Sequence, residues 1–172
     1  YTTEWAHACN TPFRKYKQNQ NEGGISTPLI AHWPAGIKNP GRRDDQRGHL
    51  IDLHATFRDL AKAQYPQEYK GQKTGRVQGI SLAPAFVGEK RPQHKEIFQT
   101  YNKYNALIQG DWKMVDSKYL YNIKNDRIES INLREQHPER FAAMVARWEA
   151  LHKEYSMGNT PNKRKKSKKK KK

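Results

Sequence analysis

The residues best suited to chemistry lie between Asn10 and Pro34, in the run NTPFRKYKQNQNEGGISTPLIAHWP. A lysine, Lys17, stands in a loop that leads into Glu22-Gly23-Gly24. A fixed ammonium presents three donors and a full positive charge to anionic oxygens. Consecutive glycines allow backbone angles and close approaches that a residue with a Cβ cannot make. Residues 27–33 then predict a buried apolar strand with proline near its start.

The same run resembles the loop and strand in the second half of the catalytic domain of type I sulfatases, most closely the bacterial arylsulfatases. The family pattern is N-x-P-(F/L)-R-x-x-K followed by E-G-G-(I)-x-x-P-x-I-x-x-W-P. The resemblance implies that Lys17 is a catalytic residue that contacts the sulfate group, and it makes Arg14 a secondary substrate-binding candidate. Glu22, Gly23 and Gly24 are expected to support the loop, with Glu22 holding Arg14 or Lys17.

Two features depart from the family pattern. Relatives often have a histidine immediately before E-G-G, and this chain has Asn21 there. The family nucleophile is a formylglycine made from the cysteine of C-x-P-x-R, and Cys9 is one residue out of register for that motif. We therefore expect Cys9 to be a small, partly buried residue with no catalytic role.

The resemblance also implies a calcium ion, bound through hard oxygen ligands. The family takes two ligands from near its N-terminus and two from an Asp-Asn pair shortly before the region where this chain begins. We expect no metal site in this chain, because Asp44-Asp45 sits among arginines and Asp52 matches a structural helix position. Calcium and formylglycine are expected in the full-length enzyme, and neither is expected in this chain alone.

Three further motifs extend the resemblance to about Tyr155. They are I-D-L-x-x-T at 51–56, G-x-S-L-x-P at 79–84 and D-x-x-E-x-x-N-L at 126–133. The first lies in residues 49–63, whose apolar spacing predicts a helix with one face packed inward. His49, at its start, is a second substrate-binding candidate.

The C-terminal half predicts a small sheet and one helix. Alternating runs at 96–101, 104–108, 112–115 and 119–123 predict strands, with a hairpin turn at 109–111. Pro138 suits the first position of a helix. Apolar residues then recur every three or four positions and predict a face that packs on the sheet: Phe141, Met144, Val145, Trp148, Leu151, His152 and Tyr155.

The resemblance implies an α/β fold of the alkaline-phosphatase type, here the end of the main sheet followed by a small antiparallel sheet with one packed helix. We expect residues 1–63 to form the C-terminal end of the catalytic domain and residues 64–94 to be a connecting segment. Residues 95–157 are expected to form a small α+β subdomain. Residues 158–172 are expected to be a disordered lysine-rich tail.

The net charge of +16 is concentrated in that tail, since residues 163–172 hold nine of the 33 basic residues. The rest has 24 basic and 17 acidic residues, a net charge of +7. A lysine tail binds polyanions non-specifically by counterion release. No motif for specific nucleic-acid recognition or membrane-spanning run is present. The missing start leaves localisation open, and the family resemblance implies a periplasmic or secreted protein.

The sequence thus favours an arylsulfatase-like hydrolase of R–O–SO₃⁻ esters whose nucleophile and calcium come from a missing N-terminal part, so that the fragment alone is inactive. Its substrate would be a sulfate ester, including sulfated polysaccharide. Two alternatives stay open. One is a basic, non-enzymatic polyanion-binding protein. The other is a phosphatase or phosphonate hydrolase on the same fold.

Overall fold

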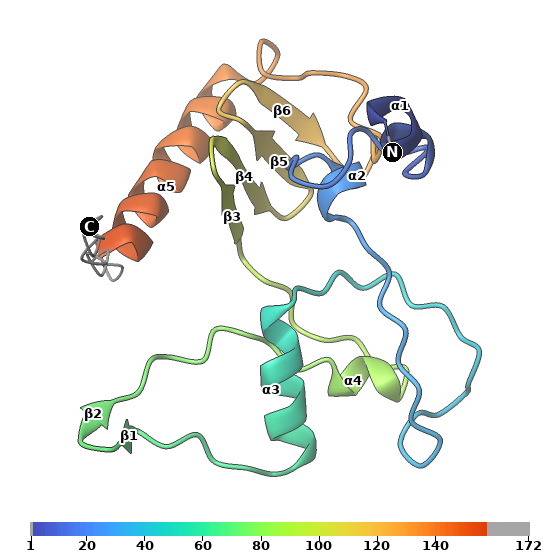
Figure 1. Cartoon of the computed structure of the whole chain (residues 1–172), viewed down its shortest axis with the longest axis vertical. Coiled ribbons are helices and arrows are strands. Elements are labelled where there is room, and N and C mark those ends of the chain that lie inside the picture. Colours follow the sequence, from blue (N-terminus) through green and yellow to red (C-terminus); the bar gives the residue numbers. More distant parts are fainter. Residues whose placement is uncertain (1, 158–172) are drawn as a thin grey trace, which may run out of the picture. The chain divides into compact units, whose positions relative to one another are not determined.

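The computed structural model describes residues 2–157, which divide into two compact units (Figure 1). The first, here the sheet unit, combines residues 2–25 with 98–157. The second, here the α3 unit, is residues 26–97. The predicted disordered tail, residues 158–172, lies outside the described residues. No helix among the described residues is long and apolar enough to cross a membrane.

A four-stranded antiparallel sheet forms the centre of the sheet unit, in the order β3-β4-β5-β6. Its register pairs Leu107 with Met114 and Met114 with Leu120, which places these apolar side chains on one face. All four predicted strands are therefore confirmed, with a hairpin at Gly110 between the second and third. Their bounds are β3 Ile97–Tyr101, β4 Tyr104–Gln109, β5 Trp112–Val115 and β6 Tyr119–Asn122.

Helix α5 (Pro138–Met157) covers that apolar face of the sheet (Figure 1). It begins at the predicted proline. Met144 and Leu151 of the helix are buried against Leu107, Met114 and Leu120. The Trp148 indole also donates a hydrogen bond to the Gln99 carbonyl of β3, 3.0 Å away. The predicted packing of this helix on a small antiparallel sheet is confirmed.

The N-terminal residues of the sheet unit form two short helices, α1 (Thr3–Ala8) and α2 (Glu22–Ile25). Cys9 caps the C-terminus of α1 and is exposed, so the expectation that it is partly buried is wrong. None of the residues of α1 is buried, and Cys9 directly follows this helix on the same exposed segment.

The α3 unit is built on α3 (Ile51–Leu60), within the predicted helical range. The apolar spacing predicts an inward face formed by Leu50, Ile51, Leu53, Phe57, Leu60 and Ala61. That face is wrong, since Leu50 and Phe57 are exposed while Asp52, Ala55 and Thr56 are buried. Hydrogen bonds to residues 80–82 decide which face is covered. The remaining elements are β1 Glu68–Tyr69, β2 Gln72–Lys73 and α4 Ala83–Phe86.

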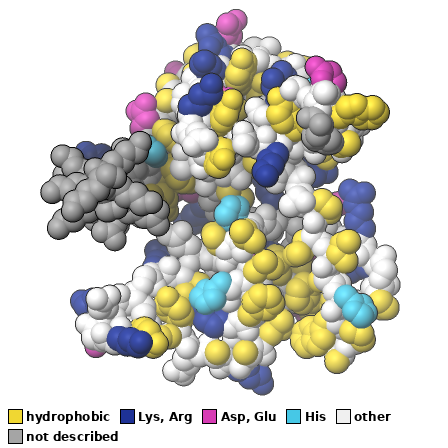
Figure 2. Space-filling model, viewed as in Figure 1, with side chains coloured by type: hydrophobic (Ala, Val, Ile, Leu, Met, Phe, Trp, Pro, Cys, Tyr) yellow, Lys and Arg dark blue, Asp and Glu magenta, His cyan; other side chains and the backbone are white. Residues whose placement is uncertain are grey.

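Residues 27–33 do not form the predicted strand. Leu29 and Ile30 are 62% and 90% exposed, and hydrophobic side chains gather on the surface of the α3 unit (Figure 2). A strand needs a neighbour for its backbone N–H and C=O groups. No strand pairs with this segment in the part of the chain that the structure describes.

Candidate functional site

Lys17 lies in a closed loop of residues 14–24, here the Lys17 loop. The Gly23 N–H donates to the Arg14 carbonyl at 2.8 Å and closes the loop. A tighter turn lies inside it, where the Asn19 N–H donates to the Tyr16 carbonyl at 3.1 Å. Lys17 is exposed in this turn, and no hydrogen bond or ion pair holds its ammonium within residues 2–157. The loop thus presents a cation to solvent on a backbone that is hydrogen-bonded to itself.

The two glycines of the loop are required by close approach. A Cβ on Gly23 would lie 2.3 Å from the Lys15 carbonyl oxygen, and one on Gly24 would lie 2.1 Å from the Asn19 carbonyl oxygen. Neither glycine has a positive φ. Glycine permits both unusual backbone angles and close approach of other groups. This loop depends on the close approach, because there is no room for a side chain at either position.

A buried ion cluster of Glu22, Lys113 and Glu129, here the Lys113 cluster, joins the loop to the sheet. The Lys113 ammonium lies 2.8 Å from Glu22 Oε1 and 2.7 Å from Glu129 Oε1. The Lys113 and Glu129 side chains are fully buried, and that of Glu22 is 9% exposed. The predicted supporting role of Glu22 therefore has a different partner, because Glu22 pairs with Lys113 of β5 rather than with Arg14 or Lys17.

Glu129 makes the most contacts with the loop. Its Oε2 accepts hydrogen bonds from the Asn21 side chain at 2.9 Å and from the Glu22 N–H at 3.0 Å. Its backbone carbonyl accepts a bond of 2.7 Å from the Arg14 guanidinium. Glu129 also has a φ of 58°, a left-handed conformation that is uncommon for a residue with a side chain.

Arg14, predicted as a substrate-binding residue, is exposed but is hydrogen-bonded to other parts of the sheet unit. Besides the Glu129 carbonyl, its guanidinium lies 3.5 Å from the Tyr121 hydroxyl. Burial raises the pKa of Tyr121 to about 12, against the opposing effect of the nearby Arg14 charge. These contacts give Arg14 an anchoring position at the start of the loop, and its contact with substrate remains a prediction.

The second polar cluster belongs to the α3 unit and is centred on Asp52. The buried Asp52 carboxylate lies 2.6 Å from the Arg91 guanidinium and 2.6 Å from His94 Nε2. Burial would raise the pKa of Asp52, but hydrogen bonds from the N–H groups of Ile80 and His49, and from the His94 and Arg91 side chains, hold it below its ordinary value. Asp52 therefore has the structural role that the sequence predicts for it.

His49, the other predicted substrate-binding residue, lies beside this cluster. Its backbone N–H donates to Asp52 Oδ2 at 2.9 Å, and its ring meets that of His94 edge-on, with centroids 6.3 Å apart. Burial lowers the pKa of His49, the Asp52 charge opposes that shift, and His94 adds to it. Lys17 belongs to the sheet unit and His49 to the α3 unit.

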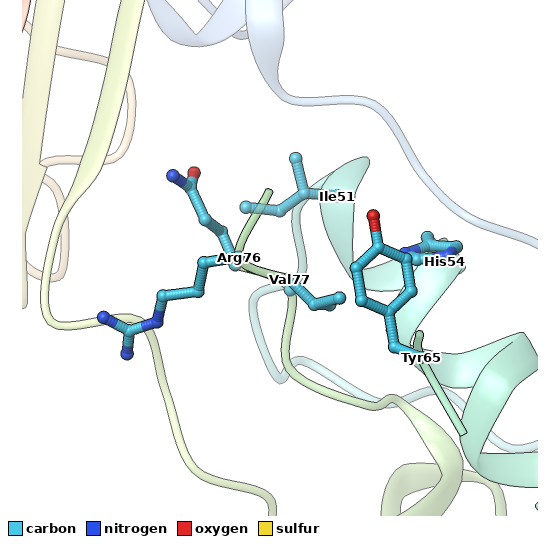
Figure 3. A pocket seen from close by; sticks show the side chains of 7 residues that line it. Ile51, His54, Tyr65, Arg76 and Val77 are labelled. Carbon is cyan, nitrogen blue, oxygen red and sulfur yellow. The ribbon is translucent and has the colours of Figure 1, made fainter. Parts of the chain in front are cut away.

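A shallow cavity of about 270 Å³ opens beside α3 (Figure 3). The His54 and Tyr65 rings meet edge-on in its wall, with centroids 5.7 Å apart. Its lining contains no carboxylate, no thiol and no serine or threonine hydroxyl. The residues that line it are Ile51, His54, Tyr65, Arg76, Val77, Gln78 and Gly79.

The described residues do not fit the calcium ion that the resemblance implies. They contain no group of three or more histidine, cysteine, aspartate or glutamate side chains that could hold a metal ion. The buried carboxylates of Glu22, Glu129 and Asp52 are engaged by Lys113, Arg91 and His94. No catalytic step through a metal can be derived from these residues.

Comparison with curated proteins identifies relatives across nearly the whole chain. The chain is 26% identical over 174 residues to an uncharacterized sulfatase of Schizosaccharomyces pombe, an alignment that covers 94% of this chain. It is 26% identical over 151 residues to a sulfatase of Formosa agariphila, which covers 76% of it. It is 31% identical over 104 residues to the N-acetylgalactosamine-6-sulfatase of Canis lupus familiaris, covering 60% of this chain. These relatives are sulfatases, and the predicted resemblance to the C-terminal portion of that family is confirmed.

The alignments cover only part of the length of each relative. The chain spans 31% of the length of the S. pombe protein, 27% of the F. agariphila protein and 19% of the canine protein. That coverage agrees with the C-terminal portion that the motifs predict. No family model matches the chain.

Solved structures agree on the fold. Ps i-CgsB superposes with a TM-score of 0.67 and 24% identity over 83% of this chain and 32% of that one. A Bacteroides thetaiotaomicron protein from a locus for metabolism of multiple glycosaminoglycans gives a TM-score of 0.61 and 22% identity over 81% and 32%. The predicted sulfatase-type fold is confirmed by these likenesses.

Sequence reasoning did not identify Lys113 and Glu129 as partners of the Lys17 loop. Glu129 lies in the D-x-x-E-x-x-N-L motif, which was a usable signal. Lys113 alternates with Trp112 and Met114, and such alternation places a lysine on the face opposite the apolar residues. In a free-standing hairpin that face is exposed, whereas here the Lys17 loop and residue 129 cover it.

Proposed function

We propose that this chain is the C-terminal part of a sulfuric ester hydrolase that cleaves R–O–SO₃⁻ to an alcohol and inorganic sulfate. The observation that carries the proposal is its similarity to sulfatases over 94% of its length. The substrate class follows from the same relatives, among them an N-acetylgalactosamine-6-sulfatase. Sulfated sugars, free or in polysaccharides, are therefore the substrates that we propose.

Lys17 contacts the sulfate group in this proposal. A sulfate ester carries negative charge on its nonbridging oxygens, and more develops on the leaving oxygen during cleavage. A preorganised cation stabilises such charge at little cost in reorganisation. Support comes from the exposed Lys17 ammonium and from the hydrogen bonds that close the loop around it.

The nucleophile and the metal come from elsewhere in the full-length enzyme. We propose that an N-terminal part supplies formylglycine and calcium, and that the 172-residue chain alone has no sulfatase activity. Exposed Cys9 is out of register for the family motif, and the described residues offer no metal site. The exposed Leu29 and Ile30 fit a segment that pairs with further strands of a larger sheet.

An assay on 4-methylumbelliferyl sulfate tests the inactivity of the chain alone. The purified chain and its Lys17→Met variant should show the same background signal. Turnover by the chain that is lost in the variant would contradict the proposal.

A chimera tests the role of Lys17. The chain replaces the matching segment of the F. agariphila sulfatase, and kcat is measured for Lys17→Met and for the neighbouring exposed control Lys15→Met. Loss of one donor to developing charge costs about 10²–10³ in kcat, so Lys17→Met should fall by that factor and Lys15→Met should not. A chimera that cleaves phosphate esters in preference to sulfate esters would favour the phosphatase alternative.

A further inference from the structure

The Lys17 loop is attached to the rest of the sheet unit mainly through one residue, Glu129. Both carboxylate oxygens and the backbone carbonyl of Glu129 are used at once, toward Lys113, Asn21, the Glu22 N–H and Arg14. These contacts reach the loop at its start and near its end. We infer that Glu129, with Lys113 as its counter-ion, is a positioning residue that holds the Lys17 loop on the sheet. This inference rests on the proposed role of Lys17.

The chemistry of the contacts suits a carboxylate better than a neutral group. Glu129 Oε2 receives two N–H donors, and Oε1 faces an ammonium, so every partner of the side chain is a donor. An amide at this position would turn one of its own N–H groups toward a donor. A fully buried carboxylate also needs a nearby cation, and Lys113 at 2.7 Å supplies it.

The cluster also couples the loop directly to strand β5. Lys113 lies in the middle of the sheet, paired in register with Ile108 on one side and Tyr121 on the other. The Lys113 ammonium contacts Glu22, which lies three residues after Asn19, the end of the turn that bears Lys17. The sheet, which is rigidified by the α5 core, thus fixes the position of a loop that has little apolar packing of its own.

Asn21 has a defined part in this arrangement. It occupies the position where relatives often carry histidine, and its side chain is buried and donates to Glu129. Asn21 therefore replaces the family histidine at a buried position that donates a hydrogen bond to Glu129, and not at a position exposed beside Lys17.

Amide hydrogen exchange on the full chain measures the positioning. In Glu129→Gln the amides of Gly23 and Gly24 should exchange about tenfold faster or more, because local opening becomes easier. Amides of β4 and β5 should keep their rates, as should all amides in the exposed control Glu135→Gln. Unchanged exchange at Gly23 and Gly24, or equal acceleration across β4 and β5, would overturn the inference.

Titration with inorganic sulfate tests whether Glu129 affects sulfate binding at Lys17 or only the stability of the loop. Sulfate should shift the NMR signals of Lys17 in the native chain, and Glu129→Gln should raise the apparent Kd severalfold while Glu135→Gln leaves it unchanged. Native affinity in Glu129→Gln would overturn the positioning role. If sulfate leaves Lys17 unaffected in the native chain, the proposed role of Lys17 fails, whereas the exchange result still decides whether Glu129 anchors the loop.

A milder variant keeps the test decisive if Glu129→Gln does not fold. Asn21→Ala removes one donor to Glu129 and leaves the ion pair intact. Faster exchange confined to residues 14–24 supports the inference, and native exchange in this loop contradicts it.

Discussion

Glu22 and Lys113 are 91 positions apart in the chain, yet Glu22 Oε1 lies 2.8 Å from the Lys113 ammonium in a buried site. With Glu129, this pair fastens the N-terminal loop to the sheet of the C-terminal half. Two segments that the sequence assigns to different regions therefore form one unit. The predicted domain boundaries at 63/64 and 94/95 remain predictions.

Removal of the central cation should destabilise the sheet unit. Lys113→Met leaves two carboxylates buried without their counter-ion, and breaking a buried pair in this way costs about 3–5 kcal/mol. Urea unfolding followed by far-UV circular dichroism measures the loss. The control is Lys124→Met, because Lys124 forms an exposed pair with Asp111 at 3.7 Å. That variant should lose less than about 1 kcal/mol, and an equal loss in both variants would contradict the role of the cluster.

A methyl group at Gly24 should disturb the Lys17 loop. The added Cβ would lie 2.1 Å from a backbone carbonyl oxygen, so the backbone itself must shift. Overpacking of this kind costs about 1–3 kcal/mol. Gly75→Ala is the matched control, since nothing lies within 4 Å of its Cβ position and its φ is not positive. Thermal unfolding compares the two, and native stability in Gly24→Ala would refute the close approach.

Asp52 should make the α3 unit sensitive to acid. Its folded pKa lies below its unfolded value of 3.8, so it stabilises the fold above that pH. The contribution is lost as the pH falls through the folded pKa. We expect amide signals of residues 51–60 to report unfolding below about pH 4. Asp52→Asn should be less stable at neutral pH and should lack this acid transition. The same transition in the variant would assign it to another group.

His49 should add a separate transition nearer neutrality. Burial holds its pKa below 6.5, so the unfolded chain takes up a proton at a higher pH than the folded chain. Stability of the α3 unit should therefore fall as the pH drops below 6.5. His49→Gln should flatten the dependence of the unfolding free energy on pH in this range, measured by urea titration at several pH values. His32→Gln is an exposed control that should leave it unchanged.

The lysine-rich C-terminus should account for polyanion binding. Deletion of residues 158–172 removes nine basic residues and lowers the net charge from +16 to +7. Retention on heparin should then shift to a much lower salt concentration, because fewer counterions are released on binding. Undiminished, salt-sensitive retention after deletion would favour the alternative of a basic binding domain.

Much of the sheet unit was predictable because its signals are local. The hairpin around Gly110, the strand alternation and the proline at the start of α5 each depend on residues close in sequence. The glycine pair also indicated a tight loop. Nothing local could identify the partner of Glu22, because the covered face of β5 exists only once the loop has folded over it.

The sequence by itself determined the family motifs, the strands and helix of the C-terminal half, and Lys17 as the candidate for sulfate contact. Only the tertiary structure decided that the buried face of α3 is the one that carries Asp52, and that residues 27–33 join no strand within residues 2–157. Only it showed that the Lys17 loop is held by Lys113 and Glu129. Periodicity and turn signals act over a few residues, whereas pairing of buried charges and coverage of a face depend on segments that meet only after folding.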